Sequence, residues 1–398
     1  MEFLWTSSTL GMAAVPVCRE RRSIRKEVSG GRAGMEAFSR MSIKNIALPG
    51  PALILPVLVL ALLAAVCSAS SGDTNKTGTD GTVTITDMLG RKVTMPKTIH
   101  RVLALHPIPT GLLAILAPQD QVSIDSYFQR SLKTHDLYTD DEYKRLSNLP
   151  VTGVYFTGIS AEQIIELHPD VVITMVNDKN IDREQQQTGI PFFAVSKAPT
   201  SSYETTIRLV GQIVGQQKRA GEMAGFWAET VQSVENTTAK TTRHPTVLYT
   251  GKNGHTTSVP GRNTVFGSTI DTAGGQSVGD ELPSAFASNE SNPVSMEQVV
   301  KWNPDIIIAS GAASRNTIMT DPQWHALKAV QTGHVYAPRA FAGLDGLQAV
   351  LGMVWTQGVL IEGDDAAAEA RLTSLMQSYY QLFYGHTLTA SQIGEPAR

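Results

Sequence analysis

One segment of the chain occurs twice, and this internal repeat limits the fold more than any other feature. Ser160–Ile173 reads SAEQIIELHPDVVI, and Ser295–Ile308 reads SMEQVVKWNPDIII. In each copy, a serine and an acid suit the start of a helix, and apolar residues follow at helical spacing. A Pro-Asp pair then precedes an all-aliphatic stretch that is typical of a buried strand. A helix–turn–strand unit present twice predicts two similar α/β lobes.

Short apolar runs elsewhere supply further strands for these lobes. They alternate with segments of helical pattern, so we expect mostly parallel sheets with helical crossovers. Asp87–Arg91 lies between two such runs and is predicted to be a hairpin turn, which makes its charged residues turn residues. The expected strands are Thr82–Thr86, Lys92–Met95, Arg101–Leu105, Phe192–Val195, Thr246–Thr250 and His334–Tyr336.

The segment between the two lobes has the pattern of a long helix. Tyr203–Asn236 carries apolar residues mainly three or four positions apart. This spacing predicts one amphipathic helix, which at 1.5 Å per residue would be roughly 50 Å long. Glycines weaken such a helix, and the alternative is a hairpin of two helices that breaks near Gly215. We expect an N-terminal lobe over 82–200, a bridging helix over 201–236 and a C-terminal lobe over 237–398.

The beginning of the chain resembles an export signal. Lys44 precedes the nearly all-aliphatic run Ala52–Val66, and small residues follow it. This order is typical of a cleaved secretory signal. We expect 1–40 to be an extension or a start assigned too early, 41–70 to be the signal and 71–81 a flexible tether. The mature protein would then be periplasmic; the alternatives are an uncleaved membrane anchor and lipidation of Cys67.

Composition and missing motifs exclude several classes of function. The chain has 33 Lys and Arg against 36 Asp and Glu, and this balance argues against nucleic acid as its main partner. Its two cysteines, Cys18 and Cys67, cannot form a disulfide framework or a CxxC zinc site. The sequence contains no phosphate-binding Gly-x-x-x-x-Gly-Lys loop, no Gly-x-Gly-x-x-Gly and no His-Glu-x-x-His. These absences argue against an enzyme, and we expect no cofactor.

The order of several motifs resembles the class III periplasmic substrate-binding proteins, which serve ABC importers of iron–siderophore complexes, haem and vitamin B12. The resemblance covers about Thr82 to Tyr384. It implies two Rossmann-like lobes, joined by a single long helix, with the ligand in a cleft between them. It also implies a monomer that works with an ABC permease and its ATPase. The motifs are Asp87–Arg91 with Arg101–Ala104, the two repeats, Ala273–Gly275, and Trp324 with Gly333–Tyr336.

The resemblance implies a ligand class and a docking role. We expect an iron(III)–siderophore complex, because that substrate is the commonest in the family. A corrinoid or haem is the alternative within the same class. An oxyanion such as molybdate, a free transition-metal ion or a sensor role are further alternatives. In the family, glutamates matching Glu162 and Glu297, one in each repeat, dock onto arginines of the permease.

The residues that follow the expected strands are candidates for ligand contact. Ligands of open α/β sheets bind beyond the carboxyl ends of the strands. Rings supply contact area, and cationic groups pair with the oxygens of an anionic chelate. Among these residues, His106 and Asp178 could coordinate a metal directly. The candidates for ligand binding are His106, Lys252 and Arg339 after expected strands, Tyr155 and Phe156 just before the first repeat, and His255 and Arg262 in the loop 255–266.

Overall fold

The computed structural model describes residues 81–132, 137–251, 255–261, 263–283, 291–339, 341–362 and 366–393. Among these residues, no helix combines the length and the apolar character that crossing a membrane requires. The expected export signal, Cys67 and most of the tether lie outside the described residues. Two of the candidate site residues, Lys252 and Arg262, lie outside them as well.

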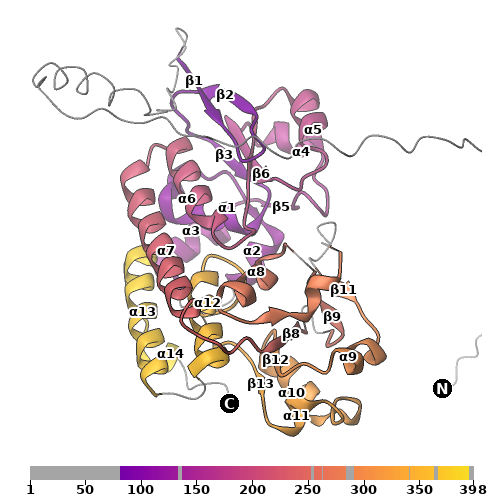
Figure 1. Ribbon diagram of the computed structural model, residues 1–398. Coiled ribbons are helices and arrows are strands. Elements are labelled where there is room, and N and C mark those ends of the chain that lie inside the picture. Colours follow the sequence, from indigo (N-terminus) through magenta and orange to yellow (C-terminus); the bar gives the residue numbers. More distant parts are fainter. Residues whose placement is uncertain are drawn as a thin grey trace, which may run out of the picture. The chain divides into compact units, whose positions relative to one another are not determined.

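A parallel three-stranded sheet forms the centre of the N-terminal lobe (Figure 1). Its strands β3 (Val102–Ala104), β6 (Val171–Met175) and β7 (Phe192–Val195) lie in that order and are wholly buried. Buried strands of this kind are continuously apolar because both faces are covered. A second parallel pair, β4 (Ile124–Asp125) and β5 (Val151–Thr152), completes the strands of the lobe's core.

The predicted hairpin at the start of the lobe is confirmed. β1 (Thr82–Thr86) pairs antiparallel with β2 (Lys92–Pro96). In the turn, Asp87 accepts hydrogen bonds from the backbone N–H of Leu89 and from the guanidinium of Arg91. Its carboxylate also accepts the N–H of Ala194 in β7 at 3.2 Å. Asp87 and Arg91 are therefore structural residues that tie the hairpin to the sheet.

The C-terminal lobe contains a four-stranded sheet, in which the predicted parallel strands are joined by one strand that was not predicted, β10. Its strands lie in the order β10 (Gln276–Ser277), β8 (Thr246–Thr250), β12 (Ile306–Ala309) and β13 (Val335–Tyr336). A short antiparallel pair, β9 (Ser258–Val259) and β11 (Asn292–Pro293), accompanies it. Helices of the two lobes, besides those discussed below, are α1 (Pro107–Leu116), α2 (Ser126–Ser131), α3 (Asp140–Ser147), α5 (Ile181–Thr188), α8 (Val265–Thr272), α10 (Ala312–Thr320) and α11 (Lys328–Gln331).

The two copies of the repeat fold alike. The helices α4 (Ala161–Glu166) and α9 (Met296–Trp302) lead into β6 and β12 respectively. The hydroxyl of the preceding serine, Ser160 or Ser295, accepts the backbone N–H three residues on and so caps its helix. Both copies then pass through the left-handed backbone region, at His168 with φ 43° and at Asn303 with φ 40°. The prediction of two similar helix–turn–strand units is confirmed.

The aspartate of each repeat has the same structural role. The Asp170 carboxylate accepts the backbone N–H groups of His100 and Arg101, which lead into β3, at 2.8 and 2.9 Å. In the other lobe, the Asp305 carboxylate accepts the N–H of Thr246, the first residue of β8, at 2.9 Å. Each carboxylate therefore holds the start of the parallel strand beside its own.

The prediction of one continuous bridging helix over 201–236 is wrong. The segment forms two helices, α6 (Ser202–Ile213) and α7 (Gln217–Thr238), with Gly215 between them at φ +72°. The two helices pack so closely that a Cβ on Gly211 would lie 2.1 Å from the Cβ of Ala220. The glycines thus allow a tight helical hairpin, which was the alternative, and α7 alone leads on to β8.

The C-terminal helices connect back to earlier parts of the chain. α12 (Ala349–Gln357) continues through a π-helical turn, Gly358–Glu362, towards α13 (Ala366–Tyr384) and the short α14 (Ala390–Ile393). α13 lies beside α7 (Figure 1), with Phe226 6.0 Å from Tyr379 between ring centroids. Tyr384 of α13 also contacts Tyr138 of the N-terminal lobe at 5.8 Å. One hydrophobic core therefore contains residues of both lobes.

We expect Asp305→Ala to lower the free energy of unfolding by about 1–2 kcal/mol, because a charged acceptor of backbone N–H is lost. The hydrogen bond from Lys328 and those from Thr246 lower the pKa of Asp305 below its ordinary value of 3.8. The contribution is therefore complete above pH 3.8 and is lost as the pH falls through the folded-state pKa. Urea unfolding at pH 7 and near pH 3 measures this difference.

Asp182→Ala is the matched control, since the Asp182 side chain is 86% exposed and its ion pair with Arg91 is a surface pair. It should change stability by less than about 0.5 kcal/mol. Equal losses in the two variants would contradict the structural role of Asp305.

Candidate functional site

Three strands of the N-terminal lobe present aromatic side chains at their carboxyl ends. His106 follows β3, Tyr127 follows β4 in the first turn of α2, and Tyr155 and Phe156 follow β5. Parallel strands bring these ends to one edge of the lobe. The ring centroids of successive members lie close together: 6.0 Å for His106 and Tyr155, 5.1 Å for Tyr155 and Phe156, and 5.4 Å for Phe156 and Tyr127.

Arg130 extends this row of rings with a positive charge. Its guanidinium carbon lies 4.0 Å from the ring centroid of Tyr127, which is cation–π geometry. Arg130 is exposed, whereas Tyr127, Tyr155 and Phe156 are half-buried. We call these four residues, together with His106, the aromatic edge. It can offer ring surface and a cation to the same ligand.

His106 is held in a defined orientation. It is 7% exposed, and its Nδ1 accepts the backbone N–H of Ile108 at 3.2 Å, which caps α1. In the neutral ring, an accepting Nδ1 leaves the proton on Nε2, which is then a donor. Direct coordination of a metal by Nε2 would require this proton to leave or to move to Nδ1 at the expense of the cap. The geometry therefore suits donation to a ligand oxygen.

A buried aspartate, Asp125, holds the start of α2, the helix that carries Tyr127 and Arg130. Asp125 is fully buried and accepts the hydroxyl of Thr110 at 2.7 Å. It also accepts the backbone N–H groups of Tyr127 and Phe128 at 2.9 Å and so caps α2. Burial raises the pKa of Asp125 above its ordinary value, although these hydrogen bonds oppose the change. Asp125 thereby positions Tyr127.

The strand ends of the C-terminal lobe bond mainly to one another. Ser310, which follows β12, donates to the carbonyl of Gly251, which follows β8, at 2.6 Å. Gly251 has φ +90°, and a Cβ there would lie 2.7 Å from Ser314, so only glycine fits. His255 is exposed. These contacts close the loops at this edge, and His255 takes no part in them.

Arg339, which follows β13, lies in an unexpected environment. Its side chain is only 5% exposed, and its guanidinium pairs with Glu369 of α13. Among the described residues, no hydrogen-bond partner is found for its Nε. Arg339 is therefore a buried link between β13 and α13 and does not stand exposed at a strand end.

Lys197 is a residue that sequence reasoning missed. It lies two residues after β7, and its largely buried ammonium group pairs with Asp345 at 3.0 Å. Asp345 belongs to the segment between β13 and α12, so the pair connects the two lobes. The candidate metal ligand Asp178 instead turns back to its own loop, where it accepts Thr174 and the N–H of Asn180.

Two residues of the aromatic edge, Tyr127 and Arg130, were also missed. Their strand, Ile124–Asp125, has only two residues and gives no periodic signal. The detectable signal was the spacing Tyr-x-x-Arg, which puts a ring and a cation on one face of a helix.

The two repeat glutamates are exposed in the first turns of their helices. Hydrogen bonds with its own backbone and with Ser160 lower the pKa of Glu162 below 4.5. Hydrogen bonds with Ser295 and with its own backbone do the same for the pKa of Glu297. Both side chains therefore stay ionised in mildly acidic solution.

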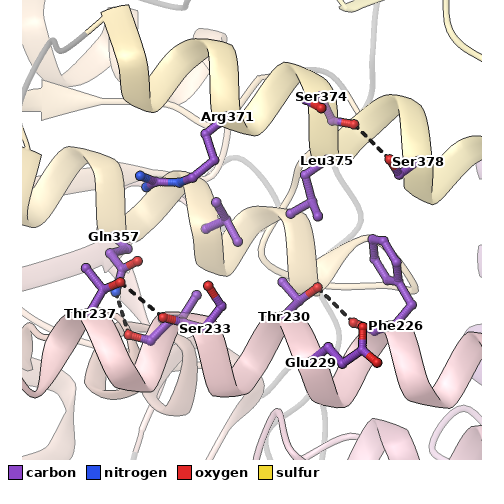
Figure 2. A pocket seen from close by; sticks show the side chains of 12 residues that line it. Phe226, Glu229, Thr230, Ser233, Thr237, Gln357, Arg371, Ser374, Leu375 and Ser378 are labelled. Atoms are coloured by element: carbon purple, nitrogen blue, oxygen red, sulfur yellow. Dashed lines mark hydrogen bonds between the residues drawn. The ribbon is translucent and has the colours of Figure 1, made fainter.

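A groove of about 480 Å³ lies elsewhere, between α7, α12 and α13 (Figure 2). The hydroxyls of Thr230, Thr237 and Ser378 on its wall donate to carbonyls of their own helices. These donors are already used within the helices, and Gln357 donates to the carbonyl of Val234. Glu229 and Arg371 also line the groove.

Two other kinds of site, a hydrolase nucleophile and a metal centre, do not match the described residues. Gly275–Gly279 reads GQSVG and matches the Gly-x-Ser-x-Gly pattern of hydrolases. Its Ser277, however, ends the two-residue strand β10 and precedes a 3₁₀ turn, whereas a nucleophile elbow joins a strand to an α-helix. Within the described ranges, no three His, Cys, Asp or Glu side chains are grouped to hold a metal ion.

Known proteins resemble this chain over most of its length. The profile of the periplasmic binding protein family matches residues 102–340. A putative ABC transporter substrate-binding lipoprotein of Bacillus subtilis, YhfQ, is 27% identical over 75% of this chain and 95% of its own. The iron-uptake system-binding protein of the same organism is 24% identical over 71% of this chain and 89% of its own.

A solved structure shares the fold. The molybdate-binding protein MolA of Haemophilus influenzae, bound to molybdate, is 21% identical and has a TM-score of 0.64. The match covers 77% of this chain and 99% of MolA. With two lobes, parallel sheets and a repeated helix–strand unit, this chain belongs to the periplasmic binding protein family, as a class III substrate-binding protein of ABC transporters.

Proposed function

We propose that this protein captures an iron(III)–siderophore complex between its lobes and delivers it to the permease and ATPase of an ABC importer. The observation that carries the proposal is the aromatic edge. Three half-buried rings in contact offer area to a bulky chelate, and the cation of Arg130 and the Nε2–H of His106 suit its anionic oxygens. Similarity to an iron-uptake binding protein supports this ligand class.

Two other types of ligand compete with the siderophore complex. A corrinoid or haem would use the same rings, since both are large and flat. Molybdate is the second candidate, because MolA shares the fold and a hydrogen-bond donor such as His106 would suit a small oxyanion. The aromatic edge favours the chelate, because a small oxyanion would leave most of the ring surface uncovered.

We propose that the mature protein works outside the cytoplasm, which the export pattern at the start of the chain supports. Two relatives are named as lipoproteins, which adds weight to Cys67 as the site of a lipid anchor. Either a free periplasmic protein or an anchored one would reach the permease from the same side of the membrane.

We expect Tyr127→Ala and Tyr155→Ala each to weaken binding of a ferric siderophore about tenfold, because each removes a ring from the contact. Calorimetric titration would compare a ferric catecholate, a ferric hydroxamate, haem, cyanocobalamin and molybdate. The control is Tyr143→Ala, which removes a half-buried tyrosine of α3 that follows no strand. Binding of molybdate alone would select the oxyanion, and unchanged affinity in both variants would refute the aromatic edge as the ligand site.

For Arg339→Ala we expect a loss of about 2 kcal/mol in the free energy of unfolding, because Glu369 loses its buried partner. Arg339 follows β13 and remains a proposed ligand contact, although its guanidinium is buried in this structure. Glu369→Gln separates the two roles, since it removes the ion pair and keeps the guanidinium. Weaker siderophore binding in Arg339→Ala than in Glu369→Gln would support contact; equal affinities would make Arg339 purely structural.

Glu162 and Glu297 are proposed to dock onto cationic groups of the permease, one from each lobe. The double variant Glu162→Gln with Glu297→Gln should keep the melting temperature and the ligand affinity. Its binding to the permease in lipid nanodiscs should fall at least tenfold at low salt and less at high salt, because exposed charges are screened. Because both pKa values are lowered, wild-type docking should persist at pH 4.5.

The control for this variant is Glu222→Gln with Glu235→Gln, which makes the same charge change on exposed positions of α7. If the control loses as much affinity as the test variant, only net charge matters and the docking assignment is wrong.

A further inference from the structure

The repeat exposes aliphatic side chains as well as carboxylates. Among the described residues, the large hydrophobic side chains that stand exposed are Leu89, Val151, Ile165 and Val300, with 43–45% of their area accessible. Ile165 and Val300 occupy the same position in the two copies of the repeat. A single exposed aliphatic residue is ordinary. The same exposure at equivalent sites of two lobes needs an explanation.

Packing within the lobes does not supply that explanation. The preceding residues, Ile164 and Val299, are fully buried and already connect the helices to their lobes. The following residues are exposed and differ in charge, Glu166 in one copy and Lys301 in the other. The repeat therefore tolerates divergence on its exposed face, yet both copies place an aliphatic side chain at this one exposed position.

Each aliphatic residue lies beside a docking glutamate. Ile165 follows Glu162 by three positions, as Val300 follows Glu297, and residues three apart are neighbours on a helix surface. Each lobe thus presents one carboxylate and one aliphatic group together. Two equivalent patches on one chain match a partner that presents the same surface twice, which is the property of two identical subunits related by a two-fold axis.

We propose that Ile165 and Val300 are apolar contacts of the docking surface, each inserted into an apolar recess beside a cationic group of a permease with two identical subunits. The proposal rests on the docking role of the two glutamates. The carboxylates steer and orient the approach, and the aliphatic groups add affinity by leaving water. The occupant is therefore a partner with paired cationic and apolar features.

The test is the double variant Ile165→Gln with Val300→Gln, which keeps helix-forming side chains of similar length. Binding of the ligand-free protein to the permease complex of the same cell, in lipid nanodiscs, would be measured at low and high salt. We expect binding about tenfold weaker or more at both salt concentrations, since burial of apolar surface is not screened. The matched control is Leu89→Gln with Val151→Gln, which removes equally exposed aliphatic groups outside the repeat.

The outcomes separate two claims: that the glutamates dock onto the permease, and that Ile165 and Val300 add an apolar contact. If the glutamine variants of the glutamates lose binding and the Ile165 and Val300 variant does not, docking stands and the apolar contact is wrong. If neither variant loses binding, the docking face itself is wrong. An equal loss in the Leu89 and Val151 control would show a general effect of exposed aliphatic groups and would also overturn the inference. Circular dichroism and melting confirm that each variant is folded.

Discussion

A single carboxylate in each lobe holds two neighbouring strands of the central parallel sheet in register. Asp170 and Asp305 hold the beginnings of neighbouring parallel strands at 2.8–2.9 Å. Because these strands run in the same direction, the register set at their amino ends determines which residues emerge together at the other edge. In the N-terminal lobe, the strand held in this way is β3, whose end presents His106. Tyr155 is placed beside His106 by its own N–H, which donates to the carbonyl of Leu105. The aromatic edge is assembled from the ends of separate strands, so its rings meet only if backbone hydrogen bonds fix those ends relative to one another.

The two lobes are joined by side-chain packing and not by one continuous bridging helix. Thr200, after β7, bonds to Ser268 of α8, and Lys197 pairs with Asp345. Leu347 lies so close to α1 that a Cβ on Gly111 would meet it at 3.1 Å. The ring contact between α13 and the N-terminal lobe adds to these links. A single hydrophobic core contains residues of both lobes. Relative motion of the lobes must therefore preserve a common hydrophobic interior, which favours small displacements over wide opening.

Elements that depend on local sequence patterns could be predicted from the sequence, whereas features that depend on contacts between distant residues could not. The repeat, the hairpin and the buried strands were read correctly because each carries its own apolar pattern or turn residues. The break at Gly215 was given only as an alternative, because α6 and α7 both keep helical spacing and bury one face. The pairing of Arg339 with Glu369 joins residues of different elements, so a strand-end rule alone expected an exposed cation. Tyr127 was missed because its strand has two residues.

The proposed ligand and docking surfaces are neighbours because of how a helix precedes a parallel strand. A crossover helix runs back along the sheet, so it begins near the carboxyl edge of the strands. Tyr155 and Phe156 therefore lie just before Ser160, the cap of α4. The connection is a tight turn: the N–H of Gly158 bonds to the carbonyl of Val154, and a Cβ on Gly153 would lie 2.3 Å from the carbonyl oxygen of Gly158. A turn closed in this way has little freedom to absorb movement. If a ligand binds at Tyr155 as proposed, a displacement of this residue would therefore be passed to the start of α4, where Glu162 lies.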